Sequence, residues 1–204
     1  MNAMPTIWLA SKSPRRAELL QGMGVPFEVL QFTDDAGAQY EVDESVHPGE
    51  PPRDYVRRVA LDKALHAFSY VRDRQLVARP VLSADTTVAL GERILGKPAD
   101  ATEASEMLAA LSGQVHEVLT AVVVIDGHDI RQMLSVSRVH FMELSVETID
   151  RYVASGEPFD KAGAYGIQGH AGIFVAEMQG SFTGIMGLPV HETACLLGPS
   201  GYCI

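Results

Sequence analysis

Two arginines stand at the start of an expected helix, where acidic side chains are the usual choice. Ser13 and Pro14 are typical of an N-cap and a first helical position, so Arg15 and Arg16 fall in the first turn. The free amide groups there already carry partial positive charge. With Ser11 beside them, the arginines suit an anion, and guanidinium geometry favours a phosphate. A solvated arginine pair is the alternative, because misplaced surface charge costs little.

Asp85 interrupts VLSADTTVAL (residues 81–90), a short apolar and β-branched stretch that predicts a strand. Acids are depleted in strands, and a buried carboxylate must be paired, hydrogen-bonded or bound to a metal. Asp85 is therefore a candidate for catalysis or metal binding. An ordinary structural ion pair is the alternative.

Three further charged residues are weaker candidates. Lys63 falls on the apolar stripe of an amphipathic helix, and a lysine reaching solvent from the stripe's edge is an equal alternative. Lys97 follows an expected hairpin, and Glu44 is one of several acids in a loop, so each is typical of solvated charge. A divalent metal needs such carboxylate oxygens, however, and phosphate chemistry usually needs the metal.

The stretch FDKAGAYGIQGHAG (residues 159–172) combines recurrent glycines with Gln168. The glycines suggest a backbone that closely approaches something flat or rigid. An amide that both donates and accepts hydrogen bonds suits the edge of a nucleobase. A glycine-rich loop with no ligand is an equal alternative.

Composition narrows the class of protein. The chain has 204 residues, 47% of them hydrophobic, and a net charge of −10. This charge argues against a nucleic-acid-coating role, and the few local cations suit a small anion instead. Its two cysteines form no metal-ligand spacing, and no apolar run is long enough for a membrane span, so we expect a cytoplasmic protein. Zinc-type histidine spacing and a P-loop are also missing from the sequence.

Strands and helices alternate along the chain, which predicts a mixed α/β fold. The runs on either side of Asp126-Gly127 indicate an antiparallel hairpin. Residues 33–52 are expected to be a loop, and residues 157–187 a glycine-rich loop with one strand. Strands are predicted over 6–10, 27–32, 80–90, 115–125, 130–144 and 172–178, with a turn at 91–92, and helices over 14–23, 51–70, 100–112, 145–155 and 189–197.

Six segments in register resemble the Maf family of house-cleaning nucleoside triphosphate pyrophosphatases. The segments are LASKSPRRAELL, YVRRVALDKA, SADTTV, GKPADATEASEMLAALSGQVHEV, DKAGAYGIQG and GLPVHET. The resemblance runs over residues 7–197 and implies a single domain over residues 5–200. It further implies a mixed twisted sheet with flanking helices, and two lobes around a central cleft as in Maf and ITPase-like proteins. The implied reaction converts a nucleoside triphosphate and water to the monophosphate and pyrophosphate, assisted by Mg²⁺ or Mn²⁺.

The resemblance also implies a role for each candidate residue. Asp85 matches the proposed general base and, with Glu44, a metal ligand. The substrate-binding and specificity positions are Ser11, Arg15, Arg16, Lys63, Thr86, Lys97 and Gln168. Ser-Pro-Arg-Arg, Ala-Asp-Thr and Tyr-Gly-Ile-Gln-Gly resemble the branch that acts on dTTP and UTP.

Other functions stay open at this stage. One is a pyrophosphatase for a modified nucleotide, and another is a nucleotide-binding regulator of cell division without turnover. We expect a nucleoside triphosphate as partner, with neither nucleic acid nor membrane, and leave a homodimer open.

Overall fold

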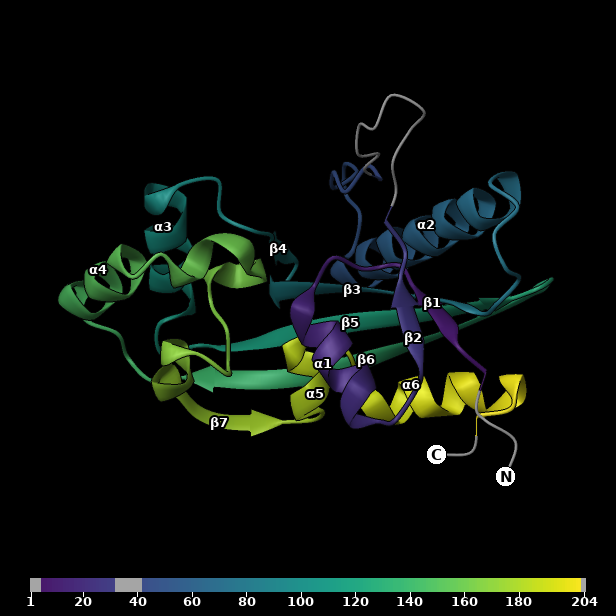
Figure 1. Cartoon of the computed structure of the whole chain (residues 1–204). Coiled ribbons are helices and arrows are strands. Elements are labelled where there is room, and N and C mark those ends of the chain that lie inside the picture. The colour runs from purple at the N-terminus through teal and green to yellow at the C-terminus, as the bar shows by residue number, and fades with distance from the viewer. Residues whose placement is uncertain (1–4, 32–41, 203–204) are drawn as a thin grey trace.

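The computed structural model describes residues 5–31 and 42–202, in which a long mixed sheet forms the centre of the molecule (Figure 1). The strands lie in the order β2-β1-β3-β5-β6-β7, and β4 pairs with β3. β1 runs parallel to β2 and β3, whereas the other pairs are antiparallel. The bounds are β1 Ile7–Leu9, β2 Phe27–Val29, β3 Val81–Leu90, β4 Arg93–Leu95, β5 Val115–Asp126, β6 Asp129–Phe141 and β7 Val175–Gln179.

The β5–β6 hairpin is the longest pairing in the sheet. Its register runs from Val115 opposite His140 to Asp126 opposite Asp129, and Gly127 adopts a φ of +61° in the turn. The turn requires left-handed backbone, and an Asp-Gly pair favours it because these residues adopt that conformation readily. β5 is buried along most of its length, since helices cover both of its faces.

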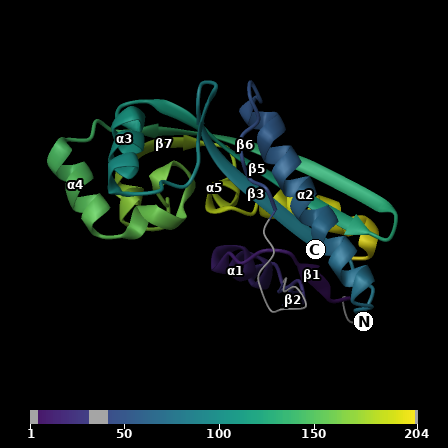
Figure 2. The same ribbon diagram turned by 90° about the horizontal axis from the view of Figure 1, so that it is seen from above.

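Helices cover both faces and one end of the sheet. Figure 1 shows α2 above the sheet, α6 below it, and α3 and α4 together at one end. Figure 2, seen from above, places α2 across β3 and β5. The helix bounds are α1 Pro14–Gly22, α2 Pro52–Asp73, α3 Ala101–Leu111, α4 Val146–Ala154, α5 Phe182–Met186 and α6 Val190–Leu197.

Local sequence signals set several helix ends. Asp100 caps α3 by accepting the amide of Glu103, and Ser145 caps α4 by accepting that of Thr148. α2 begins at Pro52, and a row of small apolar residues along it packs against β3 and β5. No helix in the two described ranges is both long enough and apolar enough to cross a membrane.

The structure confirms the mixed α/β fold and has a strand or helix in each predicted stretch, although β2 ends at Val29 and β6 at Phe141, three residues earlier than predicted. It also corrects one whole region. Residues 157–187 are not a loop with a single strand. They hold three 3₁₀ turns, at Glu157–Asp160, Ala162–Ala164 and His170–Phe174, and the short helix α5. The strand there begins at Val175 rather than Gly172. Residues 33–41 of the predicted loop lie outside the described residues, residues 42–51 are irregular as expected, and Pro52 already begins α2.

We expect Gly163→Ala to lower the free energy of unfolding by about 1–3 kcal/mol more than Gly156→Ala. Both glycines have left-handed backbone, with φ of +68° and +77°. A Cβ at Gly163 would lie 2.9 Å from atoms of Val88 on β3, whereas one at Gly156 meets open space. Urea unfolding measures both variants, and equal losses would contradict the packing explanation.

Candidate active site

A gap in strand pairing beside β3 holds the central candidate residues. β1 pairs with Val81 and Leu82 at one end of β3, and β4 pairs with residues 88–90 at the other. Between them, residues 83–87 face β5 on one side and no described strand on the other. Because β1 and β3 are parallel, the carboxyl end of β1 opens beside this gap, which is where α/β proteins commonly bind ligands.

On the face covered by α2, two carboxylates converge on one ammonium group. The Lys63 Nζ lies 2.7 Å from Asp85 Oδ1 and 2.8 Å from Glu44 Oε1. Asp85 is only 6% exposed, so the lysine supplies the charge partner that its burial requires. The predicted acids and Lys63 therefore form one cluster, contributed by β3, α2 and the segment before α2.

Tyr55 on α2 holds the backbone of the segment that carries Glu44. Its hydroxyl donates to the backbone oxygen of Glu44 at 3.0 Å. Burial, reinforced by the negative charges of Asp85 and Glu44, raises the pKa of Tyr55 to about 12. The phenol therefore stays protonated and remains a donor throughout the neutral range. Sequence analysis missed Tyr55, although its place one helical turn into α2 marks it as facing the sheet.

Arg16 binds three groups on the opposite side of the same strand segment. Its Nη1 donates to Ser11 Oγ at 3.1 Å, its Nη2 to Thr86 Oγ1 at 3.3 Å and its Nε to the Gly187 oxygen at 2.8 Å. Desolvation lowers the pKa of Arg16, and the charge of Asp85 opposes that shift. A guanidinium keeps its proton even so, which leaves a fixed cation beside the start of α1.

Thr86 connects this cation to the sheet. Its hydroxyl lies 2.9 Å from that of Thr120 on β5, which donates to the Gly184 oxygen at 2.8 Å. Asp85 and Thr86 are adjacent, and successive side chains of a strand point to opposite faces. Asp85 therefore contacts α2, whereas Thr86 contacts α1 directly and α5 through Thr120.

The remaining three candidates lie around the glycine-rich segment and β4. A Cβ at Gly166 would lie 3.6 Å from Arg15 Nη2, so Arg15 reaches this segment and not the Asp85 cluster. Lys97 and Gln168 are both exposed. In the described parts of the chain, no contact joins either side chain to Asp85. The Gly163 amide donates to the Gly96 oxygen at 3.0 Å, which brings the segment after β4 beside the glycine-rich one.

The recurrent glycines have a cause within the protein itself. A Cβ at Gly166 would lie 2.8 Å from Lys161 Cε, at Gly169 1.9 Å from Glu157 Oε1, and at Gly172 2.8 Å from the Ile167 oxygen. At Gly172 the obstacle is backbone, whereas at Gly166 and Gly169 it is the end of a side chain, so close internal packing accounts for glycine at all three positions without a ligand.

A buried pair anchors the start of the segment that carries Gln168. His116 Nε2 lies 2.8 Å from the Tyr165 hydroxyl, and the Phe141 ring packs edge-on against both rings. His116 is 1% exposed, and burial lowers its pKa to about 4. The sequence offers no signal for this pair, because the apolar neighbour Val115 is exposed and His116 is the buried residue.

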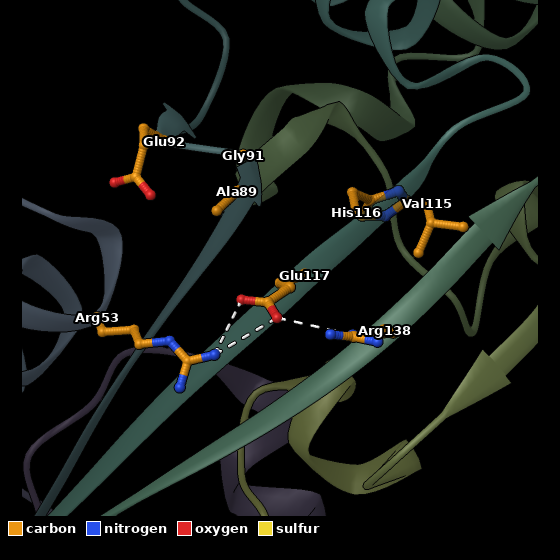
Figure 3. A pocket seen from close by; sticks show the side chains of 8 residues that line it. All are labelled: Arg53, Ala89, Gly91, Glu92, Val115, His116, Glu117 and Arg138. Atoms are coloured by element: carbon orange, nitrogen blue, oxygen red, sulfur yellow. Dashed lines mark hydrogen bonds and ion pairs between the residues drawn. The ribbon is translucent and has the colours of Figure 1, made fainter.

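A separate cavity of about 420 Å³ opens between the start of α2 and the strands β5 and β6 (Figure 3). Its two arginines, Arg53 and Arg138, both face Glu117, at 3.3 and 3.8 Å. Their charges are therefore compensated, and no predicted site residue lines this cavity.

Known proteins match the chain over nearly its whole length. The profile of the family described as Maf-like protein matches residues 6–199. The chain belongs to the Maf family. It is 52% identical to a dTTP/UTP pyrophosphatase of Aromatoleum aromaticum, over 96% of both chains. It is also 55% identical to a dTTP/UTP pyrophosphatase of Ralstonia nicotianae, over 95% of this chain and 93% of that one.

Among solved structures, the Ham1 protein of Staphylococcus aureus aligns with this Maf protein at a TM-score of 0.47 and 11% identity, covering 67% of this chain and 72% of the other.

Acid should weaken this Maf protein through His116. Between pH 6.5 and 4 the unfolded chain binds a proton at this residue that the folded chain does not. The free energy of unfolding therefore falls as pH falls through that window, by about 3 kcal/mol for this group.

The measurement is urea unfolding of the wild type and His116→Gln at pH 7 and pH 4. We expect the stability difference between them to shrink toward pH 4. His128→Gln, in the exposed hairpin turn, is the matched control and should follow the wild type. A difference independent of pH would contradict the assignment.

Proposed function

We propose that this chain hydrolyses dTTP and UTP to the nucleoside monophosphate and pyrophosphate. The observation that carries the proposal is the meeting of Asp85, Lys63 and Glu44 on one face of β3, with Arg16 held on the other. Carboxylates that could bind a metal or accept a proton thus lie near cations that could bind a polyphosphate. The names and full-length identity of the Maf relatives support the substrate class.

The carboxylates fit a divalent metal of the Mg²⁺ or Mn²⁺ kind. Glu44 and Asp85 are close enough to share one ammonium group. In the described ranges, no three His, Cys, Asp or Glu residues are grouped to hold a metal by themselves. Mg²⁺ suits such a site, because it typically takes one or two carboxylates and completes its shell with phosphate oxygens and water. When bound, the metal neutralises phosphate charge and makes water more acidic.

The protein groups then have distinct tasks in the proposed reaction. Asp85 orients or deprotonates the attacking water. Arg16 and the amides at the start of α1 bind the triphosphate, with Ser11 beside them. Lys63 and Lys97 neutralise the departing pyrophosphate, so the catalysis is mainly positioning and electrostatics.

Base selection is assigned to Gln168 and Arg15 around the glycine-rich segment, together with Thr86 on β3. The uracil and thymine edges present a donor and an acceptor together, which one carboxamide can satisfy. A modified pyrimidine nucleotide fits the same chemistry and is a substrate to include in tests. The proposal places this reaction in the cytoplasm.

Asp85→Asn should reduce turnover of dTTP and UTP by at least about a hundredfold, because the amide neither takes a proton nor carries charge. Pyrophosphate release from a panel of nucleoside triphosphates, with Mg²⁺, Mn²⁺ or no metal, measures the effect. Asp150→Asn, exposed on α4, is the control. With the fold verified by circular dichroism, an Asp85→Asn rate within about tenfold of wild type would remove Asp85 from this role. Nucleotide binding without any turnover in the wild type would favour a regulator.

Gln168→Glu should blunt the preference for UTP and dTTP over CTP. A carboxylate accepts hydrogen bonds but donates none, so it loses half of the pattern that a carboxamide reads. Competition between UTP and CTP gives the ratio of kcat/KM directly. An unchanged ranking of the bases would count against Gln168 as the selecting residue.

A further inference from the structure

The backbone around Gln168 is held by other residues and not by the Gln168 side chain. The residue is exposed, and its side-chain carboxamide makes no hydrogen bond within the described residues. A selecting amide nevertheless has to be presented within a fraction of an ångström to discriminate one base edge from another. Other contacts must therefore hold the backbone around it.

One carboxylate makes those contacts from the neighbouring 3₁₀ turn. Glu157 Oε2 accepts the backbone amide of His170 at 3.0 Å, and its Oε1 accepts the Tyr152 hydroxyl at 3.1 Å. The Glu157 side chain is 19% exposed, and Tyr152 is 5% exposed. The carboxylate thus joins α4 to the backbone two residues after Gln168.

The same carboxylate lies against the residue directly after Gln168. A Cβ at Gly169 would stand 1.9 Å from Glu157 Oε1 and 2.5 Å from its Cδ. The φ of Gly169 is −97°, which any residue adopts, so the obstacle to a larger residue here is the Glu157 carboxylate, which would have to move. The Gly169 amide also donates to the Gly166 oxygen at 2.9 Å and closes the turn that contains Gln168.

Glu157 is held at its own end as well. Lys161, itself 9% exposed, donates from Nζ to the Glu157 backbone oxygen, and the Glu157 amide donates to Ser155 Oγ at 3.3 Å. With both the backbone and the carboxylate fixed, Glu157 is a rigid support between α4 and the segment of Gln168.

We propose that Glu157 is the positioning residue for the base-reading amide of Gln168, an inference that rests on the proposed function. Glu157 acts on selectivity through the backbone of residues 169 and 170. Because it belongs to neither the Asp85 cluster nor the Arg16 network, its loss leaves the phosphate-binding groups in place.

Two substitutions test the same contact from its two sides. Glu157→Ala removes the carboxylate, and Gly169→Ala forces a methyl group into it. We expect each to lower the ratio of kcat/KM for UTP over CTP by about fivefold or more, through a higher KM for UTP. The kcat at saturating UTP, and inhibition by inorganic pyrophosphate, should stay within about twofold of wild type.

The double variant separates positioning from general damage. Without the carboxylate, the methyl group introduced at position 169 has room, so Gly169→Ala should add little to Glu157→Ala. Additive losses would overturn the contact as the cause. Glu106→Ala, exposed on α3 of the same end of the molecule, is the control and should keep both selectivity and thermal midpoint.

Calorimetric binding of UTP and CTP in the Asp85→Asn background distinguishes failure of the proposed function from failure of the proposed role of Glu157. A wild-type protein that neither hydrolyses UTP nor binds it in preference to CTP would overturn both. A wild type that prefers UTP, with that preference intact in Glu157→Ala and Gly169→Ala, would overturn only the role of Glu157. If Glu157→Ala fails to fold, Gly169→Ala decides between the same two results.

Discussion

The ion pair between Lys63 and Asp85 is the interaction on which the site depends. A carboxylate on a buried central strand is tolerated only with a partner, and at 2.7 Å the ammonium group of α2 is that partner. Lys63 therefore stands on the apolar stripe of its helix for a reason that hydrophobic packing does not supply. Removing the lysine would leave the Asp85 carboxylate buried and uncompensated, which costs more than the net value of the pair, whereas loss of Asp85 still leaves Lys63 paired with Glu44.

Successive side chains of β3 point to opposite faces of the sheet, so the site has two sides. Asp85 meets acid and lysine on one face, while the next residue, Thr86, meets Arg16 on the other. The gap between β1 and β4 leaves this short segment without a neighbouring strand on one side among the described strands. Strand register, more than any single loop, therefore brings the acidic and basic groups together.

Sequence predicted the parts of this arrangement that are local. The Asp126-Gly127 turn and the caps at Asp100 and Ser145 depend on neighbouring residues, and the acid within β3 breaks a pattern that is visible in the sequence. Partners were harder to predict. Arg15 and Arg16 are adjacent yet reach different elements, and the contact of Glu157 with Gly169 joins residues 12 positions apart through packing that no spacing encodes.

The charge balance of the cluster links its stability to the proposed chemistry. Lys63 is shared by Glu44 and Asp85, so the three groups carry a net charge of −1 on the α2 face, while Arg16 adds a cation on the other. A triphosphate brings several negative charges, which this near-neutral set balances only in part. In the proposed function, Glu44 and Asp85 would hold a divalent cation, and its charge would supply what this set lacks. Lys63, which pairs with both carboxylates in the protein alone, would then be available to phosphate oxygens, so one lysine would serve both the folded protein and the proposed substrate.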